Sequence, residues 1–230
     1  MDRLVGNRLA LAGAVLYLLE WVAIIAAAVN VPAPFDAGST DVVKAYSGHA
    51  GAFGWAAGWF SVVLLGRVLF TVGVRTALRE SGRPQALMDV AVAAMTVSVA
   101  LEVATYAVAT GIAQAPAGAE AVRMLDSSAH VLDNVVDGPL AVSVLCTGIA
   151  MWQSGLFARW LAGVGAGIGA VLTVAALTLM GPSRSGALDA ATSLVLLWWV
   201  WLLWVGVVLW RHHRPAGSAA PDPALVRDAG

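Results

Sequence analysis

The chain has 230 residues, of which 60% are hydrophobic and only 12% are charged, and its mean hydropathy is +0.81. Soluble domains carry a charged fraction of about 25%, so this composition excludes an ordinary soluble domain and predicts a multi-pass integral membrane protein. The net charge of −1 gives no basis for nucleic-acid binding. The single cysteine, Cys146, excludes an internal disulfide and C-x-x-C redox chemistry.

Six apolar segments are long enough to cross a membrane, which takes about 20 mostly apolar residues. They are residues 9–29, 52–74, 88–112, 139–157, 160–180 and 192–210. The stretches between them carry the proline, glycine and polar residues that are typical of loops. The first segment contains Glu20 and exceeds the apolar core of a secretory signal, which has about 7–15 residues. We therefore expect it to remain as the first span.

These segments predict one all-α membrane domain, residues 1–211, which is a six-helix transmembrane bundle. Residues 212–230 are rich in proline, glycine and alanine and are expected to form a disordered cytoplasmic tail. Cytoplasmic loops carry an excess of lysine and arginine. One side of the predicted bundle holds both termini and Arg3, Arg8, Arg75, Arg79, Arg83, Arg159, Arg211, Arg214 and Arg227. The other side holds only Lys44, Arg123 and Arg184, so both termini are predicted to be cytoplasmic, in the cell membrane.

Three ionisable residues lie within the predicted spans, where such residues usually face the bundle interior or a cavity. At about 1.5 Å per residue from the inner boundary, Glu20 lies about 17 Å deep, Arg67 about 11 Å and Glu102 about 21 Å. These depths favour Glu20 over Glu102 as the partner of Arg67, with Asp89 as the partner if the arginine points toward the cytoplasm. Glu102 then has no cation at its own level and is expected to be neutral.

Two interpretations of this group stay open. The first is a functional site, because a neutral buried acid can donate a proton. The second is a structural polar network that ties the first three spans together. Tyr106, one helical turn after Glu102, fits either interpretation.

Polar residues also crowd together in SSAHVLDNVVDGPL, residues 127–140. If this stretch is helical, one face carries four of them: His130, Asp133, Asn134 and Asp137. Pro139 suits the first turn of the fourth span, with Asp137 near its N-cap. The face is either the solvated side of a helix at the membrane surface or the mouth of a cavity that contains Glu20 and Glu102. One histidine and two aspartates on a single helix make an incomplete metal site.

The segment CTGIAMWQSGLFARWLAGVGAGIGAVLTV, in the fourth and fifth spans, resembles "gyLlyrSGllPrwLGvl...aG" of a bacterial family of six-span membrane proteins. That family is common in actinobacteria and is catalogued as a domain of unknown function. The start, NRLALAGAVLYLLEWVAII, is similar to the arginine, glycine and "lyLl" pattern that opens the family. The likeness extends from residue 1 to about 180, and Ala158 stands where the family often has proline. The resemblance implies six spans and carries no activity or catalytic residues.

Carboxylates without nucleophile, nucleotide or redox motifs predict a membrane-embedded enzyme. It would act on a hydrophobic, lipid-like or isoprenoid substrate by acid–base chemistry, as an isomerase or cyclase does, without a metal or other cofactor. Its catalytic residues would be Glu102 as the proton donor, Glu20 and Asp137. Its substrate-binding residues would be Arg67, Tyr106, His130, Asp133, Asn134 and Trp59. The expected partners are membrane lipid and a hydrophobic small molecule, with no nucleic acid, and a homo-oligomer is compatible with the sequence.

Two other functions stay open. A proton-coupled transporter or permease subunit would use the same acids as a relay. Against it, the sequence shows no inverted repeat and no span broken by glycine or proline, which are features of many secondary transporters. A non-catalytic membrane scaffold would use the polar residues only to hold its helices together.

Overall fold

The computed structural model describes residues 2–27, 38–79, 82, 85–115, 118–179 and 187–211, with only the backbone of 2–5, 178–179 and 187–193. Every regular element in this part of the chain is an α-helix, so the predicted all-α fold is confirmed. Six helical segments are long and apolar enough to cross a membrane, which also confirms the predicted number of spans. The predicted tail, residues 212–230, lies outside the described residues, and the cytoplasmic orientation of the termini stays a prediction.

The spans follow one another along the chain. The first consists of α1 (Asp2–Leu18) and α2 (Glu20–Ala27), and the second of α4 (Ala50–Val63) and α5 (Leu65–Arg79). The others are α6 (Ala86–Gln114), α7 (Ala119–Ser154), α8 (Arg159–Leu179) and α9 (Ala187–Arg211). The short helix α3 (Ser39–Tyr46) lies between the first two spans.

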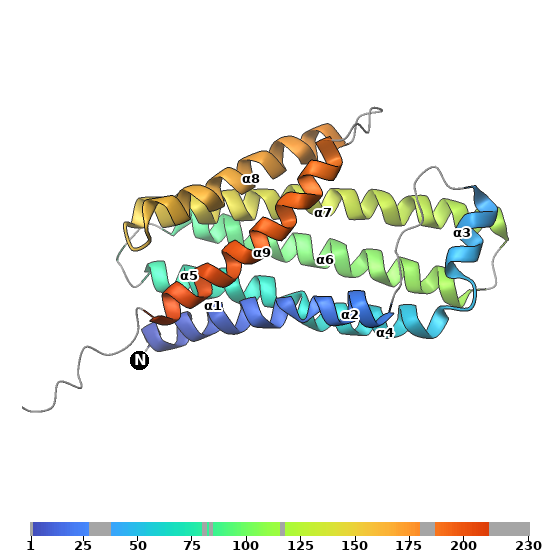
Figure 1. Cartoon of the computed structure of the whole chain (residues 1–230), viewed down its shortest axis with the longest axis horizontal. Helices are drawn as coiled ribbons and strands as arrows, with labels where there is room; N and C mark the ends of the chain where they lie inside the picture. Colours follow the sequence, from blue (N-terminus) through green and yellow to red (C-terminus); the bar gives the residue numbers. More distant parts are fainter. Residues whose placement is uncertain are drawn as a thin grey trace, which may run out of the picture.

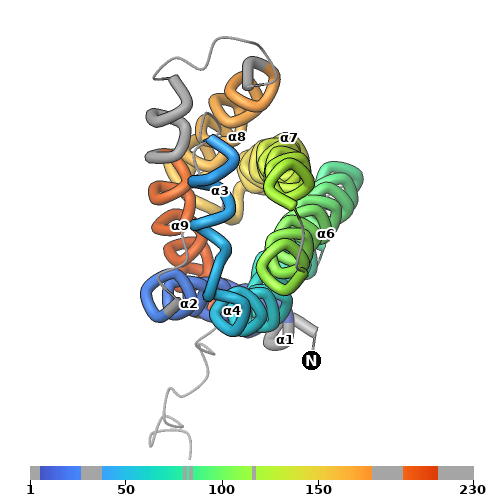
Figure 2. Tube along the Cα trace, turned by 90° about the vertical axis from the view of Figure 1, so that its right-hand side faces the viewer, coloured from blue at the N-terminus to red at the C-terminus, as the bar shows by residue number. Residues whose placement is uncertain are grey.

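The six spans form a closed ring. Each span packs against the spans that precede and follow it in sequence, and α9 closes the ring against α1 (Figures 1 and 2). The start of α1 and the end of α9 lie at the same end of the bundle, which we call the terminal end (Figure 1). Helix α3 lies at the opposite end, the α3 end (Figure 1). Any space enclosed by the ring is therefore bounded by all six spans.

Helices α4, α6 and α7 reach farther toward the α3 end than the other spans do (Figure 1). Helix α7 has 36 residues and α6 has 29, which correspond to about 54 Å and about 43 Å, against a hydrocarbon thickness of about 30 Å. Their ends, with α3 and the start of α4, enclose a second small core, the α3 lobe. Its buried apolar residues are Val42, Tyr46, Phe53, Ala109, Ile112 and Val122.

Helix α7 does not begin at Pro139, as the sequence predicts, but runs unbroken from Ala119 to Ser154 with the proline inside it. A proline has no N–H, so the carbonyl four residues earlier loses its helical partner and the ladder around it weakens. Ser98 of α6 donates a hydrogen bond to the carbonyl of Val136, at 3.3 Å. The carbonyl that loses its partner is that of Val135, one residue earlier, so the Ser98 hydrogen bond holds α6 against α7 beside the proline and does not replace the missing one. The polar stretch before Pro139, which the sequence allows to be helical, is therefore part of the same helix as the fourth span.

The first two spans contain interruptions that the sequence does not predict. One lies at Leu19, whose carbonyl accepts hydrogen bonds from the indole of Trp59, at 2.7 Å, and from the backbone N–H three residues later, at 3.1 Å. The other lies at Leu64, whose carbonyl accepts from the backbone N–H of Arg67 at 3.0 Å. Such tightened turns inside a helix often mark a hinge or a functional site. Glu20 directly follows the first interruption and Arg67 lies in the turn of the second.

Helices α1 and α5 approach each other closely through glycines. A Cβ atom at Gly13 of α1, or at Gly66 or Gly73 of α5, would overlap backbone atoms of the partner helix. Small residues allow such approach in membranes, where association depends on van der Waals contact rather than on a hydrophobic drive. The contact sets Tyr17 of α1 directly against Arg67 of α5, whose guanidinium carbon lies 4.4 Å from the centre of the tyrosine ring.

We predict that Gly73→Val lowers the thermal stability of the purified protein, because overpacking costs about 1–3 kcal/mol and here the new atoms meet the Ala10 backbone. Gly167→Val is the matched control, since a Cβ at this exposed glycine of α8 meets nothing within 4 Å. Thermal unfolding in detergent, followed by circular dichroism, makes the comparison. Equal unfolding temperatures for the two variants would contradict the α1–α5 packing.

Candidate functional site

Arg67 lies inside the ring and is only 4% exposed. Its guanidinium forms a two-point ion pair with Glu102, in which Nη1 lies 2.5 Å from Oε2 and Nη2 donates to Oε1 at 3.0 Å. Oε1 of Glu20 lies farther away, 4.0 Å from Nη2. The guanidinium carbon also lies 4.4 Å from the ring centre of Tyr17 and 5.4 Å from that of Trp198. The arginine is therefore held by one carboxylate and two aromatic faces.

The principal partner of Arg67 is thus Glu102, and the predicted preference for Glu20 is wrong. The second span was expected to end at residue 74, but α5 continues to Arg79. The starts of the other two helices also differ from the predicted ones, since α1 begins at Asp2 and α6 at Ala86. Counted from the observed helix ends at 1.5 Å per residue, Arg67 lies about 18 Å deep, Glu102 about 24 Å and Glu20 about 27 Å, so Glu102 is the acid nearer in depth. The expectation that Glu102 is an unpaired, neutral proton donor loses its basis.

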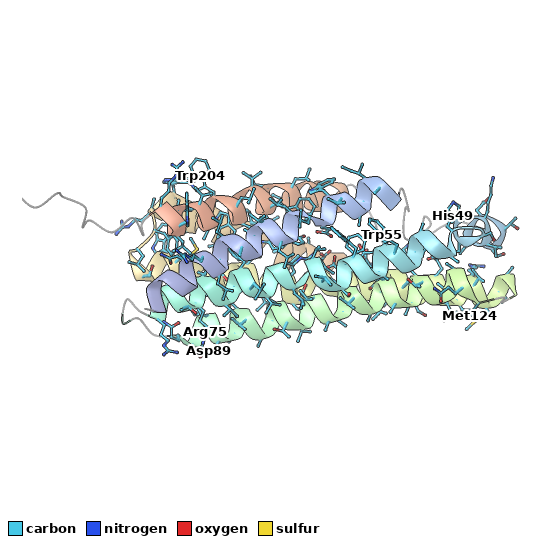
Figure 3. The ribbon with its side chains drawn as sticks, turned by 90° about the horizontal axis from the view of Figure 1, so that it is seen from below. His49, Trp55, Arg75, Asp89, Met124 and Trp204 are labelled. Atoms are coloured by element: carbon cyan, nitrogen blue, oxygen red, sulfur yellow. The ribbon has the colours of Figure 1, made fainter. Side chains whose placement is uncertain are left out.

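Asp89, the other predicted partner of Arg67, belongs to a different ion pair. Its Oδ1 accepts a hydrogen bond from Nε of Arg75 at 2.6 Å. Figure 3 shows this pair at one end of the molecule, opposite the end that carries His49 and Met124. The side chains of Arg75 and Asp89 are 35% and 55% exposed, so this pair is a surface feature and not part of the interior network.

A cavity of about 230 Å³ lies beside the interior ion pair and is lined by residues of all six spans. Its polar wall consists of Tyr17, Glu20, Arg67, Glu102, Asp133 and Asp137. Its apolar wall consists of Val136, Leu140, Leu172, Ala175, Val195 and Trp199. The volume corresponds to about seven or eight water molecules at ~30 Å³ each, and pockets for drug-sized ligands measure about 300–1,000 Å³. The cavity therefore suits a small molecule or one end of a larger one.

The carboxyl groups of the cavity form a series from the interior to the surface. Glu20 and Glu102 are 5% and 8% exposed, Asp137 is half-buried, and Asp133 is exposed. Asp133 precedes Asp137 by one turn of α7, so it lies nearer the α3 end (Figure 1). Oε2 of Glu20 is buried and has no hydrogen-bond partner among the described residues. The innermost acid thus presents an unsatisfied oxygen beside the cavity.

The predicted polar face of α7 divides between two environments. Asp133 and Asp137 line the cavity, whereas Asn134 is half-buried and is not among the lining residues. His130 is buried away from the cavity wall, and its Nδ1 lies 3.0 Å from the backbone carbonyl and 3.4 Å from Oδ2 of Asp126. The face is therefore neither wholly solvated nor a single cavity mouth.

Asp126 connects His130 to the α3 lobe. The hydroxyl of Tyr46 donates to Oδ1 of Asp126 at 2.7 Å. The pKa of Tyr46 is raised well above its usual range, mainly by burial and to a smaller extent by this hydrogen bond. The i, i+4 spacing of Asp126 and His130 is visible in the sequence, but their contact with α3 spans 80 positions and could not be read from it. This group fixes α3 on α7.

The two aromatic residues that the sequence assigns to substrate binding lie outside the cavity wall. Tyr106 stacks on Phe60, with ring centres 4.1 Å apart and planes inclined by 13°. Trp59 stacks on Trp55 at 5.7 Å and binds the carbonyl at the first helix interruption. Both residues therefore have structural contacts available to them.

Tyr17 and Trp199 provide the aromatic part of the wall instead. Nε1 of Trp199 donates to the hydroxyl of Tyr17 at 2.7 Å, and the two rings meet edge to face, 5.3 Å apart. Tyr17 lies three residues before Glu20, which places it on the same helix face and is the signal that could have identified it. Trp199 has no comparable signal, because neighbouring tryptophans crowd its segment.

The arrangement offers proton donors and acceptors, and its carboxyl groups outnumber its cations. The described residues contain no group of three or more histidine, cysteine, aspartate or glutamate side chains placed to hold a metal ion. Comparisons with protein-family models, with curated proteins and with solved structures found no match. The family resemblance therefore stays a prediction, and the function must be argued from this cavity.

We predict that Arg67→Met destabilises the protein by about 3–5 kcal/mol, because it leaves buried carboxylates without their cation. The double variant Arg67→Met/Glu102→Gln should recover a large part of this loss, since it removes both charges of the pair. Arg75→Gln, at the exposed ion pair, is the control and should cost at most about 1 kcal/mol. Unfolding midpoints in detergent test all three, and an Arg67→Met variant as stable as the unmodified protein would refute the role of the ion pair.

Proposed function

We propose that the protein is a membrane-embedded enzyme that acts on a hydrophobic molecule by acid–base chemistry, in the cavity beside Arg67. The observation that carries the proposal is the excess of carboxyl groups. Four of them, Glu20, Glu102, Asp133 and Asp137, share one cavity with a single guanidinium. Half of the lining residues are apolar, which suits a hydrocarbon portion of the substrate.

The excess argues against a scaffold as the main role. A structural ion pair needs one carboxylate for one guanidinium, and Glu102 already occupies both Nη atoms of Arg67. Burying further carboxyl groups costs free energy unless each is paired and hydrogen-bonded. Glu20 is only 5% exposed and keeps one oxygen without a partner among the described residues. Glu20 contributes to a network that joins helices only through the longer, 4.0 Å approach of its Oε1 to Nη2 of Arg67.

The geometry shifts the proposed proton donor from Glu102 to Glu20. Acid–base catalysis needs one group that gives a proton and another that accepts one, both within hydrogen-bond reach of the substrate. Arg67 holds both oxygens of Glu102, whereas Glu20 and Asp137 line the same cavity without such a two-point partner. In this proposal Glu20 and Asp137 exchange protons with the substrate. The ion pair of Arg67 with Glu102 does not exchange protons and holds the guanidinium in place beside them.

The size of the cavity limits how a lipid-like or isoprenoid substrate would bind. A volume of about 230 Å³ is too small for a long isoprenoid chain, given that drug-sized ligands need about 300–1,000 Å³. Such a substrate would place only its reacting end in the cavity. Isomerisation by proton addition and removal needs no more than this end.

Deuterium labelling tests the proposal while the substrate is unidentified. Purified protein is incubated in heavy water with a fractionated lipid extract, and the hydrophobic molecules are then examined by mass spectrometry. An enzyme that transfers protons to and from carbon will incorporate deuterium into one discrete species. We predict that Glu20→Gln lowers the labelling rate by about 10²–10⁴-fold, the usual contribution of a general acid or base.

Asp89→Asn is the matched control for this experiment, because it also removes a carboxylate but lies in the surface ion pair with Arg75. It should label at the unmodified rate. If no fraction gains more deuterium with the protein than without it, the enzymatic proposal is wrong.

Proton-coupled transport is the second candidate, and the two interrupted spans favour it. The interruptions lie at Leu19 and Leu64, beside Glu20 and Arg67. Secondary transporters commonly build their midplane binding sites from discontinuous helices. In liposomes that contain a pH-sensitive dye, a transporter would produce proton movement that depends on an added cell extract and is lost in Glu20→Gln. An enzyme would leave the dye signal at the level of empty liposomes.

A further inference from the structure

We propose that the cavity recognises an organic cation, an alkylammonium group with a short apolar chain. This inference rests on the proposed function in that it names the substrate class of the same site, but binding does not require turnover. Three features of the cavity support it: the charges that remain after internal pairing, the buried oxygen of Glu20, and the division of the wall into polar and apolar parts.

The charges of the cavity wall favour a cation. Arg67 is the only basic residue among the described residues that line the cavity, and its guanidinium is matched by the two-point ion pair with Glu102. The faces of Tyr17 and Trp198 cover it further. Three carboxyl groups remain without a cation of their own: Glu20, Asp133 and Asp137. A cavity with this excess of carboxyl groups attracts positive charge and repels anions.

The buried oxygen of Glu20 marks the position at which a cation would bind. Glu20 is 5% exposed, lines the cavity, and its Oε2 has no hydrogen-bond partner within the described part of the chain. An ammonium group donates up to three hydrogen bonds and accepts none, so it complements an acceptor-only carboxylate. Asp137, half-buried on helix α7, supplies further acceptors in the same space.

The apolar wall fits the remainder of the ligand. Leu140, Leu172 and Val195 bring apolar side chains from three different helices to the same cavity. An inorganic ion would leave these apolar side chains exposed to water, whereas a short hydrocarbon chain would cover them. The volume of about 230 Å³ accommodates such a chain but not a drug-sized ligand. The wall therefore fits an amphiphile with a cationic head.

The series of acids along α7 provides the entrance. Asp133 is exposed and lies one turn from Asp137, which in turn shares the cavity with Glu20. Carboxylates arranged in this order raise the local concentration of a cation at the surface and guide it inward. An anion of the same size meets only repulsion along this path.

Three probes with the same six-carbon chain but different charges test whether the cavity prefers a cation. They are hexylammonium, hexanoate and 1-hexanol. Each is titrated against the full-length protein in nanodiscs, and binding is followed by tryptophan fluorescence, because Trp199 lines the cavity, and by the unfolding temperature. We expect saturable binding of hexylammonium, at least about tenfold tighter than that of either other probe, since 1.4 kcal/mol corresponds to a factor of ten. Sodium chloride at matched ionic strength should not reproduce the effect.

Glu20→Gln should weaken hexylammonium binding by at least about tenfold and leave 1-hexanol unchanged. Asp137→Asn, at a half-buried position, provides the same comparison if the first variant does not fold. Asp89→Asn removes a carboxylate outside the cavity and should bind like the unmodified protein.

Three outcomes would overturn the proposal: hexanoate or 1-hexanol binding as tightly as hexylammonium, sodium ions alone producing the same stabilisation, or both cavity variants retaining full affinity. Selective hexylammonium binding without deuterium labelling would refute the enzymatic function and leave this inference intact. Labelling of a neutral substrate without hexylammonium binding would refute this inference and leave the enzymatic function intact.

Discussion

A guanidinium inside a membrane bundle can be retained only if its charge is matched there, and this requirement organises the centre of the protein. Arg67 meets both oxygens of Glu102 and the faces of Tyr17 and Trp198. Removal of one partner of such a pair costs far more than the pair contributes, because the remaining charge stays buried. The close glycine contact of α1 with α5 helps to meet this requirement, because it brings the ring of Tyr17 against the guanidinium of Arg67.

The cavity wall contains more carboxyl groups than its single guanidinium can pair with. Glu20 approaches the guanidinium only to 4.0 Å, and its second oxygen has no partner in the described structure. Its burial therefore lowers the stability of the empty protein unless a proton or another cation shares the site. Anything that supplies this charge stabilises the folded state by binding to it. Function and stability are thus linked at one carboxyl group, which explains why the matched neutral substitution, Glu20→Gln, is the most informative change in the chain.

Hydropathy predicts the number of spans and the three interior charges, because each of these depends only on local composition. Which charges pair depends on depth, and depth is counted from span ends that composition locates poorly. The observed ends of α1, α5 and α6, taken together, place Arg67 nearer in depth to Glu102 than to Glu20. Pro139 misleads for a related reason: α7 stays continuous through the proline while it packs against α6 and α8, and these contacts are not visible in local composition. The contact of Tyr46 with Asp126 joins residues that are 80 positions apart, and only the folded ring brings them together.

The walls of the cavity differ in backbone as well as in chemistry. The polar wall comes mostly from helices with an irregularity: the turn at Leu19 precedes Glu20, the turn at Leu64 contains the N–H of Arg67, and α7 carries Pro139. The apolar wall comes largely from α8 and α9, which are uninterrupted. Because Glu20 is the first residue of α2, the position of its carboxyl group and the angle between α1 and α2 depend on each other. A ligand that binds this oxygen therefore acts on the backbone of the first span, which is the coupling that a transporter would need and that an enzyme could use to close its site.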